Sequence, residues 1–257
     1  MQGVEYRLQA FIKSSDQRSL IVDVSAGLSL GALPGLENFT PAVRRIIPQV
    51  DGVVCSPGQI NKFAGTTKED AGLLVRVDWH NTLRSGEFVL PVIKPQRVPV
   101  LTAQDALDLG AVGMVMTFLL GYEEELEAAC LHATVNLALD GKSLGMPLIV
   151  EVQASGPRVS LPGKAVELGV SYALEGGADV IVVPYPGRRS LETIGQFASV
   201  PWLLKPTSLD SALPELKEAI SLGAQGLWID FTLFAQPDPS GLLQSFYRNL
   251  HLISEPS

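Results

Sequence analysis

The chain has 257 residues, with 19 Lys and Arg side chains against 27 Asp and Glu, and its formal net charge is −8 at pH 7. This acidic balance disfavours a nucleic-acid groove or an anionic membrane surface as a partner. Cys55 and Cys130 lie far apart, so neither a disulfide framework nor a structural zinc site is predicted, and a reducing cytoplasm fits best. The longest apolar run, at 112–120, is too short to span a bilayer, and the N-terminus lacks the apolar core of a targeting segment.

Helical and strand patterns alternate along the whole chain. After a leading helix around 4–12, apolar runs typical of buried parallel strands recur at 19–24, 51–56, 71–78, just before 116–117, and at 148–153, 178–183, 200–205 and 227–230. Helices are expected between them, with Thr40, Thr102 and Ser211 as N-caps. Residues 81–99 are expected to form a lid or binding loop. The pattern predicts one (β/α)₈ TIM barrel over 1–257, with a short N-terminal helix and a C-terminal helix at 242–253.

The sixth expected strand carries a family resemblance. Residues 176–185, GGADVIVVPY, resemble the sixth strand of the DhnA-type class I aldolases of the DeoC/LacD superfamily, such as the archaeal-type fructose-bisphosphate aldolases. The resemblance covers most of the chain from about residue 20 and implies a parallel barrel with lyase activity. It also places the family's Schiff-base lysine at Val182, and a valine can neither form an imine nor accept a proton.

Among the other positions that the resemblance aligns, one matches the family and several depart from it. Asp23 matches an aspartate at the end of the family's first strand, whereas Gln153 stands where a proton-transferring tyrosine is common. The turns that usually bind phosphate after the seventh and eighth strands correspond to 206–207 and 230–231. Asp230 would repel a phosphorylated substrate through like charge.

Ionisable side chains gather at the expected strand ends, which in this fold face the mouth of the pocket. The candidate catalytic residues are Asp23, Glu151 and Lys205. The candidate substrate-binding residues are Asp78, His80, Gln153, Tyr185, Arg188, Arg189, Thr207 and Asp230.

Several of these residues have a second interpretation. Asp23 is explained equally well by a helix cap or an ion pair. Lys205 is expected to be the counter-cation of Glu151 or Asp230 rather than a displaced nucleophile, because neighbouring carboxylates raise the pKa of a lysine. The strand-end carboxylates and an imidazole could also bind a divalent cation, but no tight ligand motif supports this. No metal or other cofactor is expected.

These observations leave two main functions open. The first is a divergent aldolase-like carbon–carbon lyase, or a related carbonyl- or sugar-converting enzyme, without the usual imine lysine. The second is a non-catalytic homologue that binds a metabolite or a partner, and a metal-dependent barrel enzyme is a weaker third.

The expected ligand is a neutral or singly charged polyhydroxylated or carbonyl compound. Asp23, Gln153 and His80 would hold it by hydrogen bonds. Arg188 and Arg189 would take a single anionic group, although a solvated surface pair explains them equally well. A homo-oligomer is expected from the resemblance and from the apolar C-terminal helix.

Overall fold

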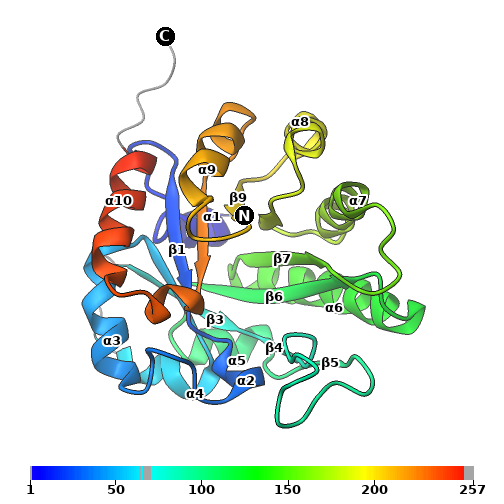
Figure 1. Ribbon diagram of the computed structural model, residues 1–257, viewed down its shortest axis with the longest axis horizontal. Coiled ribbons are helices and arrows are strands. Elements are labelled where there is room, and N and C mark those ends of the chain that lie inside the picture. Colours follow the sequence, from blue (N-terminus) through cyan, green and yellow to red (C-terminus); the bar gives the residue numbers. More distant parts are fainter. Residues whose placement is uncertain (1, 64, 66–70, 252–257) are drawn as a thin grey trace.

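The computed structural model describes residues 2–63, 65 and 71–251, and in it eight parallel strands close into a barrel (Figure 1). Around the barrel the strands neighbour one another in the order β1, β10, β9, β8, β7, β6, β3, β2. Their bounds are Ser19–Asp23 for β1, Gly52–Cys55 for β2, Gly72–Arg76 for β3, Gly113–Leu120 for β6, Leu148–Ala154 for β7, Val180–Pro184 for β8, Trp202–Lys205 for β9 and Gly226–Asp230 for β10. The expected TIM barrel is confirmed, and each of the eight expected runs overlaps one of these strands.

Helices surround the strands (Figure 1). Their bounds are Gln2–Leu8 for α1, Gly27–Leu30 for α2, Phe39–Ile46 for α3, Pro57–Ile60 for α4, Ala103–Asp108 for α5, Glu124–Leu144 for α6, Pro162–Glu175 for α7, Arg188–Phe197 for α8, Ala212–Ser221 for α9 and Pro239–His251 for α10. Short 3₁₀ turns follow α3, α4 and β10 at Ile47–Gln49, Asn61–Phe63 and Phe231–Ala235. The helices bury their apolar faces against the outer side of the barrel, which makes two concentric layers.

The barrel interior is a packed apolar cluster. Alternate strand residues point inward, so Ile149 and Glu151 on β7 share the inner face. Phe11 joins this cluster and is fully buried, and the first residues of β2 and β3, Gly52 and Gly72, lie against it. The leading helix therefore ends at Leu8 rather than at residue 12, because the chain turns at that point to close the N-terminal end of the barrel. With that end closed, the other end is where a ligand can enter.

The segment expected as a loop at 81–99 is closed at its base by a small two-stranded ribbon. Strands β4 (Asp78–His80) and β5 (Arg97–Pro99) pair antiparallel, with His80 opposite Arg97. The Asn81 side chain ties the loop between them, because it donates to Lys94 O at 2.9 Å and accepts from Gln96 N at 2.8 Å. The loop proper is thus 81–96, and the ribbon holds His80 beside the barrel mouth.

The expected N-caps have different outcomes. Thr102 is confirmed: its hydroxyl accepts from Asp105 N, and the Asp105 side chain accepts in return from Thr102 N. Thr40 is wrong, because α3 begins one residue earlier at Phe39. Ser211 lies at the N-cap position of α9 but makes no capping bond, since its hydroxyl bonds the preceding turn at Ser208.

The C-terminal helix α10 packs on the barrel. Leu243, Phe246 and Leu250 are buried in the outer core layer, while the last expected positions, 252–253, lie outside the described residues. The apolar face that suggested a homo-oligomer is therefore covered by the chain itself, and the oligomer stays a prediction. Among the described helices, none combines the length and apolar character needed to cross a membrane.

Candidate functional site

A hollow opens at the carboxyl ends of the barrel strands and encloses about 490 Å³, open solvent included. Seven of the eleven residues singled out from the sequence line it, from four barrel strands and from β4. They are Asp23, Asp78, His80, Glu151, Gln153, Lys205 and Asp230. The expectation that strand-end polar side chains converge holds for these seven.

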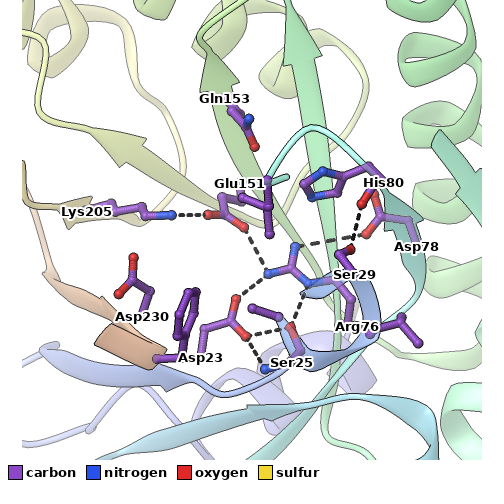
Figure 2. A pocket seen from close by; sticks show the side chains of 14 residues that line it. Asp23, Ser25, Ser29, Arg76, Asp78, His80, Glu151, Gln153, Lys205 and Asp230 are labelled. Carbon is purple, nitrogen blue, oxygen red and sulfur yellow. Dashed lines mark hydrogen bonds and ion pairs between the residues drawn. The ribbon is translucent and has the colours of Figure 1, made fainter. Parts of the chain in front are cut away.

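Arg76, the last residue of β3, lies at the centre of the hollow (Figure 2) and was missed in the sequence. Its guanidinium donates to Asp23 Oδ2 and, at 2.9 Å, to Glu151 Oε2. It also donates to the hydroxyls of Thr117 at 2.9 Å and Ser25 at 3.1 Å. Arg76 is therefore a second counter-cation in the hollow, beside the expected pairing of Lys205 with Glu151, and it bonds two of the carboxylates. The sequence did contain a signal for Arg76, because it is a single arginine within an apolar strand. A charge buried in this way needs partners of opposite charge.

The Arg76 guanidinium stays charged despite its burial. Burial alone would lower the pKa of Arg76, but attraction to Asp23 and then to Glu151 outweighs it and raises that pKa. Burial would likewise raise the pKa of Glu151, but Lys205 and Arg76 hold it well below its usual range. Arg76 and Glu151 are thus both ionised at neutral pH.

Lys205 ends β9 and bonds the other oxygen of Glu151, with 2.7 Å between Nζ and Oε1. Its side chain is 28% exposed, so it borders the open part of the hollow. Burial would lower the pKa of Lys205, but the attraction of Glu151 and Asp230 outweighs that effect and raises it. The lysine is therefore an ammonium at neutral pH, with one of its three N–H groups used by Glu151.

The two aspartates of neighbouring strands β1 and β10 lie opposite each other in register but differ in their hydrogen bonds. Asp23 is fully engaged, because Oδ1 accepts from the backbone and hydroxyl of Ser25 and Oδ2 accepts from Arg76. Asp230 uses only Oδ1, which accepts from the backbone and hydroxyl of Thr232. Its other oxygen accepts no hydrogen bond from the described residues and borders the hollow.

The two β4 residues of the site have different surroundings. Asp78 has a fully buried side chain that accepts from Arg97 Nε and from Thr117 N, both at 2.9 Å, and so ties the ribbon to the barrel. The imidazole of His80 contacts Thr82 Oγ1 through Nδ1 at 2.8 Å. Gln153 donates to the same Thr82 hydroxyl at 3.1 Å.

Four residues expected to bind substrate do not line this hollow. Tyr185 donates to Glu218 at 2.6 Å, and chiefly this hydrogen bond, then burial, raises the pKa of the tyrosine to about 12. Arg188 pairs with Glu192 and Glu218, and the neighbouring Arg189 is exposed. Thr207 borders an adjoining hollow that Lys205 and Asp230 also line. Their roles as ligand contacts stay predictions.

Val182 occupies the β8 position that the family resemblance assigns to the imine lysine. Its side chain is fully buried in the inner cluster and lies in register with Glu151 of β7. The lysine that borders the hollow is on the next strand, at Lys205. Among the described residues, no group of three or more His, Cys, Asp or Glu side chains is arranged to hold a metal ion.

Comparisons with known proteins agree with this architecture. Residues 10–198 match the family described as DeoC/LacD family aldolase. A relative from Halobacterium salinarum, 2-amino-3,7-dideoxy-D-threo-hept-6-ulosonate synthase, is 26% identical over 95% of this chain and 90% of its own length. An uncharacterized aldolase of Saccharolobus solfataricus is 26% identical over 98% of this chain and 95% of its own.

Solved structures show the same fold. An archaeal fructose-1,6-bisphosphate aldolase, whose catalytic lysine is covalently bound to the carbinolamine intermediate of its substrate, superposes with a TM-score of 0.81 at 18% identity, over 97% of this chain and 99% of that one. A fructose-bisphosphate aldolase from Slackia heliotrinireducens gives 0.79 at 15% identity, over 98% and 88%. At these identities the likeness extends to the fold alone.

Proposed function

The chain belongs to the DeoC/LacD aldolase family, and we propose that it is an aldolase-like lyase that polarises a substrate carbonyl without forming an imine. The observation that carries this proposal is the Lys205 ammonium, 2.7 Å from Glu151 at the edge of the hollow. An amine attacks a carbonyl only when it is unprotonated, and the carboxylates around Lys205 raise its pKa. The same charge makes it a strong hydrogen-bond donor to a developing oxyanion.

The lysine and one aspartate divide the proposed chemistry. In a β-hydroxy carbonyl substrate, the hydroxyl proton passes to the free oxygen of Asp230, the bond between the α and β carbons breaks, and its electron pair forms an enolate. The remaining N–H groups of Lys205 stabilise the enolate oxygen, and the proton held by Asp230 then passes to the α carbon, which restores the carboxylate. Asp23 and Glu151, both bonded to Arg76, keep the cations in place.

The charge around the hollow favours a substrate with few anionic groups. Four carboxylate side chains line it, and Arg76 and Lys205 are its two cations. This excess of negative charge disfavours a bisphosphate. The proposed substrate is a neutral or singly charged polyhydroxylated carbonyl compound.

One observation favours a second function, a non-catalytic homologue that binds a metabolite. Asp23, Arg76, Glu151 and Lys205 are joined in one chain of hydrogen bonds, and charges paired in this way are also what a purely structural barrel floor requires. In that case the hollow would bind a polyhydroxylated compound without converting it. Turnover and binding therefore have to be measured separately.

The test combines trapping with two substitutions of Lys205. Borohydride with dihydroxyacetone phosphate or pyruvate should leave the protein mass unchanged, and aldehyde release should be screened with neutral ketoses and hydroxy ketones. Lys205→Arg retains a cationic donor that cannot form an imine, so it should keep part of the activity, whereas Lys205→Met should lose it. A borohydride adduct on Lys205 would overturn the proposal, and ligand-induced thermal stabilisation without turnover would favour the second function.

A further inference from the structure

The imidazole of His80 lines the hollow, and one of its two nitrogens has no hydrogen-bond partner in the part of the chain that the structure describes. The residue is only 5% exposed, and its Nδ1 atom contacts Thr82 Oγ1 at 2.8 Å. Among the described residues no hydrogen bond reaches Nε2. Figure 2 shows the ring directed toward the space between Glu151 and Gln153, on the side opposite Lys205. A polar atom of a largely buried side chain that faces a hollow without a protein partner is suited to bind a ligand.

The hydrogen bonds around Thr82 indicate which ring nitrogen carries the hydrogen. The amide nitrogen of Gln153 donates its two hydrogens, one to Thr82 Oγ1 and one to Ser155 Oγ, both at 3.1 Å. The Thr82 oxygen is therefore an acceptor toward Gln153, and its own hydrogen has one acceptor among the described residues, His80 Nδ1. An imidazole that accepts at Nδ1 carries its hydrogen on Nε2.

We propose that His80 is a neutral imidazole whose Nε2–H donates to the carbonyl or hydroxyl oxygen of the ligand, and that Thr82 and Gln153 are the positioning residues that fix this tautomer. The chemical class of the ligand rests on the function proposed above. The oxygen would then be held from two sides, by the Lys205 ammonium and by the imidazole N–H. Two fixed donors on one oxygen stabilise the charge that develops there.

The surroundings of the ring support its neutral form. Burial is the largest influence and lowers the pKa of His80, and the guanidinium groups of Arg76 and Arg97 lower it further. The carboxylates of Asp78 and Glu151 act in the opposite direction and do not outweigh these effects. The His80 backbone is also fixed, because its carbonyl accepts from Ser29 Oγ at 2.6 Å.

Nitrogen-15 NMR of histidine-labelled protein tests the tautomer without any substrate. The chain has three histidines, and His80→Gln and His132→Gln assign the signals. At pH 7 we expect His80 to have a protonated Nε2 and an unprotonated Nδ1. A hydrogen on Nδ1, or on both nitrogens, would overturn the proposal.

Thr82 variants then test the positioning role. Thr82→Val removes the hydroxyl and should shift the His80 signals toward a mixture of tautomers, whereas Thr82→Ser should keep the wild-type pattern. An unchanged tautomer in Thr82→Val would contradict the role of the hydroxyl. Addition of dihydroxyacetone should move the Nε2 signal, and a bound ligand, detected by thermal shift, that leaves this signal unmoved would show that His80 does not contact it. If no carbonyl compound binds, the function proposed above fails while the tautomer result stands.

Discussion

Arg76 Nη2 donates to Glu151 Oε2 at 2.9 Å and thereby joins β3 to β7 across the interior of the barrel. The same guanidinium bonds Asp23 on β1, so three strands share one buried cation. Lys205 contacts the other oxygen of Glu151 and extends the chain of charges to β9. Because buried charges are costly without partners, this connected set fixes the relative positions of the side chains that border the hollow.

Replacing the central cation should destabilise the fold strongly. Arg76→Met leaves Asp23 without its cation and removes one of two from Glu151, and breaking a buried pair costs about 3–5 kcal/mol in the free energy of unfolding. Denaturant unfolding measures the loss. Arg188→Met is the matched control, since that arginine is exposed and should change stability little. Equal effects from the two variants would contradict the central role of Arg76.

Restoring a lysine at the family position should not restore aldolase activity. In Val182→Lys the new side chain would enter the fully buried inner cluster, in register with Glu151, while Gln153 and Asp230 would remain where the resembling family has other groups. Acid–base groups contribute about 10²- to 10⁴-fold in rate, so the lysine alone is insufficient. A coupled assay of fructose-1,6-bisphosphate cleavage checks this, and efficient cleavage by the single variant would show that the other roles are misplaced.

Ligand preference follows from the charge of the hollow. Thermal-shift measurements with neutral ketoses, singly charged keto acids and sugar bisphosphates should show greater stabilisation by the first two classes, because carboxylates outnumber cations in the lining. Preferential stabilisation by a bisphosphate would refute the expected substrate class. A parallel series with EDTA tests the metal-dependent alternative, which a loss of stability would favour.

His251 should make the fold less stable as the pH rises. It contacts Asp16 at 2.6 Å through Nδ1 and the buried Asp51 at 2.9 Å through Nε2, at the N-terminal end of the barrel. Burial would lower the pKa of His251, but these hydrogen bonds and charges outweigh burial and raise it. The stabilisation is thus complete below about pH 6.5, the ordinary value for histidine, and is lost as the pH rises through the folded-state pKa.

The measurement is the free energy of unfolding between pH 6 and pH 9. The difference between wild type and His251→Gln should shrink with rising pH, and the exposed His132→Gln provides a control that should leave the slope unchanged. The pKa of His80 is lowered, so its contribution to the stability of the fold is lost as the pH falls, which is the opposite dependence. The effect of His251 is therefore isolated by comparing variants rather than from the wild-type profile alone. A pH-independent difference for His251→Gln would contradict a stabilising role for protonated His251 between Asp16 and Asp51.

Local sequence patterns were sufficient for the barrel. Eight apolar runs specify buried parallel strands, and helical periodicity between them leaves few other topologies. Strand direction then brings Asp23, Glu151, Lys205 and Asp230 to one end, because the carboxyl ends of parallel strands meet there. These features depend on residues close together in the chain or on the symmetry of the fold.

Only the tertiary structure decided which charged side chains pair with one another. Arg76 looked like one residue of an apolar strand, and its partners lie 53 and 75 residues away, so no local spacing could identify them. The same holds for the early end of α1, where the barrel interior takes up Phe11, and for Tyr185 and Arg188, which pair with Glu218 of α9 rather than face the hollow. A sequence determines which side chains a strand end offers, but Coulomb attraction across closed strands decides which of them are paired and which remain free for a ligand.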